Sequence, residues 1–251
     1  MRWADKGIVL GGRPFGETSV IAEIFTCEHG RTFGLVKGGR SRRNRPLLQA
    51  GNILDTEWRA RLDDQLGVFT VELVRSSSAL VWDDPRALAA LNTLAAHLQV
   101  LPERDPHRRL YEAAAAYLEH AAEPGFAARL VRFELLLLDE LGFGLELRSC
   151  AATGTAENLV YVSPRSGQAV SSAAGAPYRD KLLRLPAFIK GADVQTPHDQ
   201  DIADGFALTG HFLKQHVFEP QGWSLPQARN DLLHLMARHS ERLSSQPAPA
   251  P

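Results

Sequence analysis

The sequence is poor in cysteine and contains no long apolar run. Its 251 residues include only two cysteines, Cys27 and Cys150, and no CxxC pair. Two cysteines are too few for a disulfide framework or a four-cysteine zinc site. The run of four leucines that starts at Leu135 is followed at once by Asp139 and Glu140, and no segment reaches the roughly 18–20 apolar residues of a membrane-spanning helix. We therefore expect a protein of the reducing cytoplasm with no membrane partner.

The sequence also lacks the motifs of common enzyme classes. It contains no GxxxxGK[ST] phosphate-binding loop, no GxSxG nucleophile motif and no HExxH metal motif. His211 and His216 are five residues apart, as are His234 and His239. That spacing separates two side chains by about 140° on a helix and suits a shared metal poorly. We expect no catalytic residues, no cofactor and no metal; a hydrolase with an unrecognised site is the alternative from the enzyme class.

Positive charge is concentrated in one short segment. The formal net charge is −1, but residues 1–50 hold nine cationic and four acidic residues, so the rest of the chain carries −6. Five of the nine cations fall within residues 37–45, which contain no acid and are called the basic loop below. Lys and Arg neutralise phosphates, so such a cluster indicates one polyanion-binding face. Its cations are Lys37, Arg40, Arg42, Arg43 and Arg45.

Residues 1–76 alternate between apolar and polar positions, as half-buried strands do. Five short antiparallel strands without an intervening helix suit a small closed barrel, and the OB-fold is the five-stranded barrel that commonly binds nucleic acid. The basic loop follows the third run, so we expect it at the barrel rim. The expected strands lie in residues 7–10, 19–26, 33–36, 54–59 and 69–73.

Aromatic side chains of the predicted barrel are candidates for stacking on bases, although a barrel core uses such residues as well. The candidates are Phe15, Phe33, Trp58 and Phe69.

After residue 80 the pattern changes to helical spacing. Asp84 and Asp105 each precede a proline, which is typical of a helix N-cap, and Thr196 precedes Pro197 in the same way. Helices are expected over residues 85–101, 106–122, 126–141 and 226–243, with a further one that begins after Thr196 and includes residues 205–217.

These patterns predict an α+β chain. A five-stranded OB-fold barrel would occupy residues 1–80, and a mostly α-helical domain would occupy residues 81–243. Residues 146–176 interrupt the helical pattern and include an expected strand at Val160 to Val162. Residues 244–251, rich in serine and proline, are expected to form a disordered tail.

Several segments together resemble the bacterial recombination mediator family RecO. Gly16 to Ser19, Thr26 to Arg31 and Val36 to Arg40 resemble that family's N-terminal domain. Phe133 to Phe143 resembles its central helix, and Leu208 to Leu213 a later helix. The likeness covers roughly residues 1–243 and depends on the order of the segments, since none is as specific as a Walker motif.

The resemblance implies a protein that binds and anneals DNA without hydrolysing nucleotides. It implies a role in loading RecA onto single strands coated by single-strand binding protein. The implied partners are single- and double-stranded DNA, RecR, the C-terminal tail of single-strand binding protein and, indirectly, RecA, and the implied location is the nucleoid in the cytoplasm. The matching DNA-contacting positions are Lys37 and Arg40, followed by Arg42, Arg43, Arg45 and Arg31.

The resemblance also implies that the helical domain receives the acidic, phenylalanine-terminated tail of single-strand binding protein. Such a peptide needs an apolar pocket for its aromatic side chain and cations for its acids. We expect two helices to supply these groups: Arg129, Arg132 and Phe133 in the first, and His211, Phe212 and Lys214 in the second.

Residues 146–176 depart from the family at its zinc finger. Many relatives carry four cysteines after the central helix, whereas here Cys150 stands alone and Thr153 takes the second position. No cysteine occurs near Ser163 to Ser166, where the second pair would fall. One thiolate cannot form a structural zinc site, so we expect a degenerate, cysteine-poor, zinc-finger-like hairpin without zinc ligands.

One alternative interpretation of the barrel remains open. An OB-fold protein that binds structured RNA would use the same basic loop, because A-form RNA is recognised largely through its phosphates and shape.

Overall fold

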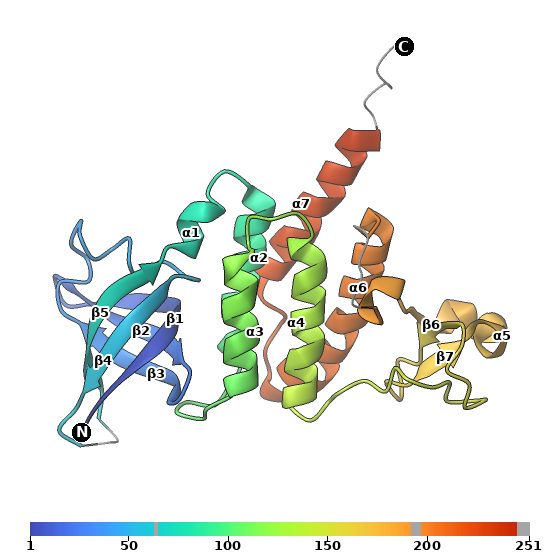
Figure 1. The fold of residues 1–251 in the computed structure, drawn as a ribbon, viewed down its shortest axis with the longest axis horizontal. Coiled ribbons are helices and arrows are strands. Elements are labelled where there is room, and N and C mark those ends of the chain that lie inside the picture. The colour runs from blue at the N-terminus through green and yellow to red at the C-terminus, as the bar shows by residue number, and fades with distance from the viewer. Residues whose placement is uncertain (63–64, 192–196, 245–251) are drawn as a thin grey trace, which may run out of the picture. The chain divides into compact units, whose positions relative to one another are not determined.

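Figure 1 shows the fold in a computed structural model, which describes residues 1–62, 65–191 and 197–244. The chain divides into two compact units, Met1–Glu123 and Pro124–Pro251. Among the residues that the structure describes, the first unit contains a barrel and three helices, and the second contains helices and a small sheet.

Two of the sequence predictions fall on residues outside this description. The expected helix cap at Thr196 lies outside the described residues, and so does the expected disordered tail from residue 245 onward. Ser244, the first residue of that predicted tail, is the last residue of a helix.

The first unit is built on a closed five-stranded barrel with the strand order β1-β2-β3-β5-β4. Strands β3 and β5 pair in parallel, and all other neighbours are antiparallel. The predicted five-stranded, OB-fold-like barrel is therefore confirmed, whereas the expectation that all its strands pair in antiparallel fashion is wrong for β3 and β5. Its strands are β1 (Arg2–Phe15), β2 (Ser19–Thr26), β3 (Gly30–Val36), β4 (Ile53–Arg59) and β5 (Gly67–Arg75).

Strand β2 is buried on both faces, although its sequence alternates as a half-exposed strand does. Ala22 and Ile24 point into the barrel core. Ile21 and Phe25, on the outer face, are also buried. The Phe25 ring lies 6.0 Å from the ring of Tyr111 on α3 (Arg108–Glu119), so helical residues of the same unit cover this side of the barrel.

The helices of the first unit follow the barrel directly. They are α1 (Ser77–Leu80), α2 (Pro85–Leu98) and α3 (Arg108–Glu119). The predicted cap of α2 is confirmed, because the Asp84 carboxylate accepts hydrogen bonds from the backbone N–H groups of Arg86 and Ala87.

The predicted cap of α3 at Asp105 is wrong, since this helix begins two residues later than the Asp-Pro pattern indicates, after His107. The Asp105 backbone packs against the barrel at Gly30, where a Cβ atom would lie 2.3 Å from the Asp105 carbonyl oxygen. Packing of this segment on the barrel thus overrides the local capping signal.

In its described residues, the second unit contains three longer helices and a three-stranded sheet of order β7-β6-β8. None of the described helices is long and apolar enough to cross a membrane. The elements are α4 (Phe126–Glu140), β6 (Leu159–Val162), β7 (Ala169–Ser171), α5 (Ser172–Gly175), β8 (Leu183–Arg184), α6 (Asp199–Phe212), a π-helical continuation (Leu213–Phe218) and α7 (Gln227–Ser244).

A buried ion pair joins the three long helices of this unit. Arg229 of α7 donates to both carboxylate oxygens of Glu134 on α4, at 2.8 and 3.1 Å. The hydroxyl of Thr209 on α6 donates to the same carboxylate. Side-chain exposure is 3% for Arg229 and 0% for Glu134, so each charge depends on the other for compensation.

We predict that Glu134→Gln destabilises the protein by about 3–5 kcal/mol, because it leaves the Arg229 guanidinium buried without a counter-charge. Urea unfolding followed by circular dichroism measures this change. The double variant Glu134→Leu/Arg229→Met should recover most of the stability, since it removes both charges.

The exposed pair between Lys214 and Glu219, at 3.5 Å, supplies the control. Glu219→Gln should change the free energy of unfolding by about 0–1 kcal/mol. Equal effects of Glu134→Gln and Glu219→Gln would contradict the importance assigned to the buried pair.

Candidate nucleic-acid interface

The basic loop leaves β3 at the rim of the barrel and has a defined backbone. Gly38 adopts a left-handed conformation with φ of +65°. A Cβ atom on Gly39 would lie 2.9 Å from Cβ of Val20, so this position is closely packed on β2. The backbone N–H of Ser41 donates to the Gly38 carbonyl at 3.0 Å, and that of Arg45 donates to the Ser41 carbonyl at 2.9 Å. The loop therefore presents its side chains from a fixed scaffold.

The five cations of the basic loop are exposed. Arg40 also fastens the loop to the β1–β2 turn: its guanidinium donates to the carbonyl oxygens of Gly16 and Glu17 at 3.3 and 2.9 Å. In the described part of the chain, none of the five forms an ion pair. Their positive charge is thus clustered and uncompensated, which is the arrangement that attracts a polyanion.

Asn52, which sequence reasoning missed, holds the end of the segment that follows the loop. Its side chain is fully buried. Its amide nitrogen donates to the Pro46 carbonyl at 2.9 Å, and its amide oxygen accepts from the Ser78 hydroxyl at 2.9 Å. One side chain thereby ties the segment after the basic loop to the first helix.

Arg31 lies apart from the basic loop and is engaged within the protein. Its guanidinium pairs with Glu23 at 2.6 Å and donates to the Leu101 carbonyl at 2.7 Å. Gln99 donates to the other Glu23 oxygen at 2.8 Å. The residues after α2 therefore cover part of the β2–β3 face, which other OB-folds use to bind oligonucleotides.

The four aromatic candidates separate into different environments. Trp58 and Phe69 are 1% and 3% exposed. Both belong to the barrel core, which is the alternative to base stacking that the sequence left open. Phe33 is half-buried beneath Arg31, whose guanidinium carbon lies 5.4 Å from the ring centroid. Phe15 is 51% exposed and precedes the turn that Arg40 contacts.

A cavity lies at the rim of the barrel opposite the basic loop. This cavity of about 530 Å³ is lined by residues that include Arg2, Trp3, His29, Trp58 and Arg104. Of its lining residues, only Trp58 is a candidate for base stacking from the sequence. Trp3 and His29 come from a strand end and a turn, where a single aromatic residue carries no distinctive pattern.

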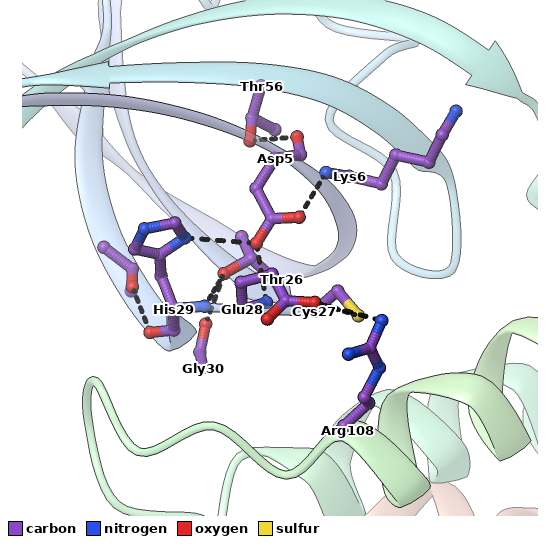
Figure 2. A network of polar contacts seen from close by, with 10 residues as sticks. Asp5, Lys6, Thr26, Cys27, Glu28, His29, Gly30, Thr56 and Arg108 are labelled. Atoms are coloured by element: carbon purple, nitrogen blue, oxygen red, sulfur yellow. Dashed lines mark hydrogen bonds and ion pairs between the residues drawn. The ribbon is translucent and has the colours of Figure 1, made fainter.

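The turn that carries His29 is held by one buried carboxylate (Figure 2). Asp5 accepts hydrogen bonds from the backbone N–H groups of Lys6 and Glu28 at 2.8 and 2.7 Å. The same side chain accepts from Nδ1 of His29 at 3.2 Å. Arg108 pairs with Glu28 at 3.3 Å, which fastens the turn to the start of α3.

In the second unit, an apolar groove of about 640 Å³ lies between α6 and α7. Phe206 and Ala207 line it from α6, and Leu233 and Met236 line it from α7. Lys214, whose side chain is 61% exposed, also lines the groove. This surface combines apolar walls with an accessible cation.

The structure does not gather the predicted peptide-binding residues into one surface. Phe133 and Phe212 are 4% and 2% exposed and pack in the interior. Arg132 donates to the carbonyl oxygens of Phe188 and Gly191, at 2.7 and 3.0 Å. Arg129 donates to the Pro124 carbonyl at 3.0 Å. Of the predicted set, His211 and Lys214 line the groove.

The finger-like region contains a β6–β7 hairpin with Cys150 packed beside it. Cys150 is 2% exposed, and its sulfur accepts from the backbone N–H of Ser171 at 3.3 Å. Hydrogen bonds from Thr153 and Ser171 lower the pKa of the Cys150 thiol to about 6. Within the described ranges, no group of three or more His, Cys, Asp or Glu side chains is placed to hold a metal ion.

Comparison with known proteins gives matches over most of the chain. Residues 1–77 match the family model described as "Recombination protein O N terminal", and residues 83–226 match "Recombination protein O C terminal". Proteins named "DNA repair protein RecO" are similar along nearly their whole length. That of Mesorhizobium japonicum is 51% identical over 240 residues, with 95% of each chain covered.

Two further relatives carry the same name. The protein of Brucella abortus strain 2308 is 48% identical over 239 residues, covering 95% of this chain and 97% of its own. The protein of Methylorubrum extorquens is 52% identical over 235 residues, covering 91% of this chain and 96% of its own.

We predict that protein purified without chelator contains no stoichiometric zinc, because a single thiolate provides one of the four ligands that a structural site needs. Elemental analysis measures the metal content. Thermal unfolding with and without EDTA should give the same midpoint. One zinc per chain, or a lower midpoint in EDTA, would contradict the prediction.

Proposed function

The chain belongs to the RecO family, and from this membership we propose that it is a DNA-binding recombination mediator in DNA repair. In this role it binds and anneals single- and double-stranded DNA, cooperates with RecR, and helps load RecA onto strands coated by single-strand binding protein. It does so in the cytoplasm, at the nucleoid, without hydrolysing nucleotides.

The uncompensated charge of the basic loop is the observation that supports DNA binding most strongly. Five exposed cations without an ion-pair partner in the described residues project from a hydrogen-bonded backbone. Such cations release counterions from the phosphate backbone, which gives affinity that depends on salt and is independent of sequence. This binding suits a protein that acts on any strand, single or double.

We predict that Lys37→Ala/Arg42→Ala/Arg43→Ala weakens binding to all DNA sequences alike. The slope of log affinity against log salt should fall by about 1 for each phosphate that the variant no longer neutralises. Fluorescence anisotropy over a salt series measures both quantities. Arg40 is left intact because it also holds the β1–β2 turn.

The matched control removes three exposed cations from the second unit, in the variant Arg165→Ala/Arg179→Ala/Lys181→Ala. It should retain the wild-type affinity and slope. Equal reductions in both variants would show a dependence on net charge alone and would defeat the assignment to the basic loop. A preference for structured RNA in competition with single-stranded DNA would instead support the RNA-binding alternative.

The groove between α6 and α7 is our proposed docking site for the C-terminal tail of single-strand binding protein. Its apolar walls suit the terminal phenylalanine, and Lys214 suits the acidic residues and the terminal carboxylate. Asp199 lines the groove near the start of α6, and Lys214 lies just beyond its end. The negative charge at one end of the groove and the positive charge at the other would orient the tail with its acidic groups toward Lys214.

We predict that Lys214→Glu strongly weakens capture of the tail peptide and leaves binding to naked DNA intact, since the basic loop lies in the other unit. Ala207→Phe, which fills the groove, should have the same effect without a charge change. Isothermal titration with the peptide measures the first property, and anisotropy with DNA the second.

Lys181→Glu, an exposed charge reversal outside the groove, should bind the peptide as the wild type does. If Lys214→Glu and Ala207→Phe both bind normally, the groove is the wrong site. If DNA binding falls together with peptide binding, the two activities do not belong to separate surfaces.

A further inference from the structure

The cavity at the rim opposite the basic loop has a wall of stacked aromatic rings. The imidazole of His29 lies parallel to the indole of Trp3, with ring centroids 4.1 Å apart and an angle of 7°. Trp3 is in turn nearly parallel to Trp58, at 5.6 Å and 12°. Trp58 is almost fully buried, whereas the His29 side chain is 36% exposed. His29 is therefore the outer ring of a short stack that starts in the barrel core.

The outer ring is held in place before any ligand arrives. Nδ1 of His29 donates to the Asp5 carboxylate, as the dashed line in Figure 2 shows. The Asp5 side chain is only 8% exposed. The His29 backbone N–H donates to the Thr26 hydroxyl at 3.2 Å. A platform fixed by its own hydrogen bonds loses little side-chain freedom when a ligand stacks on it, which favours binding.

The size and charge of the cavity suit a nucleobase with its phosphate. Its volume of about 530 Å³ falls within the range of small-ligand sites. Arg2, whose exposed side chain also pairs with Glu57 on β4, and Arg104, whose guanidinium carbon lies 5.5 Å from the Trp58 ring centroid, are both on the lining; the one acid on the lining, Glu28, is itself paired with Arg108. Every base has a flat face that stacks on an aromatic ring without regard to sequence.

We propose that this cavity binds one unpaired nucleobase, stacked on the outer face of His29, with its phosphate beside Arg2. The proposal rests on the proposed DNA-binding function and deepens it, because it assigns an interaction that discriminates between single strands and duplex. A paired base is enclosed within the double helix and cannot enter the cavity. The basic loop contacts phosphates of either form, and the His29 cavity adds affinity for single strands.

The test compares two substitutions of the same ring. His29→Ala removes the stacking surface, and His29→Phe keeps an aromatic face without the hydrogen bond to Asp5. With labelled oligo-dT of about 16 nucleotides, the upper site size of an OB-fold, His29→Ala should lower the affinity about tenfold. His29→Phe should stay close to the wild type, and all three proteins should bind duplex DNA equally.

His120→Ala is the matched control, because His120 is an exposed histidine of the same unit outside the cavity. It should bind both DNA forms normally. An unchanged affinity of His29→Ala for oligo-dT would overturn the proposal. So would equal reductions in His29→Ala and His29→Phe, or a parallel reduction for duplex DNA, because either result would assign the effect to the shape of the turn.

Tryptophan fluorescence gives a second measurement. Trp82 and Trp223 are 76% and 50% exposed, so the variant Trp82→Phe/Trp223→Phe should fold and leave Trp3 and Trp58 as reporters. Oligo-dT should quench this emission, and duplex DNA should not. Failure of the wild type to bind any DNA would defeat the proposed function itself. DNA binding without quenching, and without an effect of His29→Ala, would defeat the cavity proposal alone.

Discussion

Closure of the barrel depends on β1, the long first strand, whose two ends pair with different neighbours. Arg2 to Ile8 of β1 pair with β4, and Gly7 to Phe15 pair with β2, with a register shift between Val9 and Gly11. Without this double pairing the sheet would have two open edges. Closure places the β1–β2 turn and the basic loop at one rim and the His29 turn at the other. The two proposed DNA-binding surfaces therefore belong to opposite ends of a single rigid frame.

The second unit uses a different kind of constraint. The Glu134–Arg229 pair joins α4 to α7 by a buried charge interaction whose separation carries a large free-energy penalty, and the Thr209 hydroxyl joins α6 to the same carboxylate by a hydrogen bond. The Arg229 guanidinium also lies close to α6 at Gly210. A Cβ atom at that position would lie 2.9 Å from the guanidinium, so a larger residue there would crowd Arg229. The same residue lines the apolar groove. The group that holds the helices together thus also shapes the surface we assign to peptide docking.

The elements of the fold were largely predictable, because their signals are local. Alternation identified the barrel strands, and Asp84 before Pro85 identified the start of α2. Contacts between residues distant in sequence could not be predicted in this way. Arg31 resembles the loop cations in sequence, but its partner carbonyl at Leu101 is 70 residues away. Phe133 and Phe212 lie at plausible surface positions on single helices and are buried by the packing of several.

The cover over the outer face of β2 has a practical consequence for dissecting this protein. Ile21 and Phe25 are buried there, and Phe25 packs near Tyr111 of α3. A fragment that ended at the last barrel strand would expose this apolar strip to water and invite self-association. The smallest soluble piece should therefore extend to Glu123, where the first compact unit ends. Expression of the barrel in isolation would yield aggregates even though every one of its strands was present.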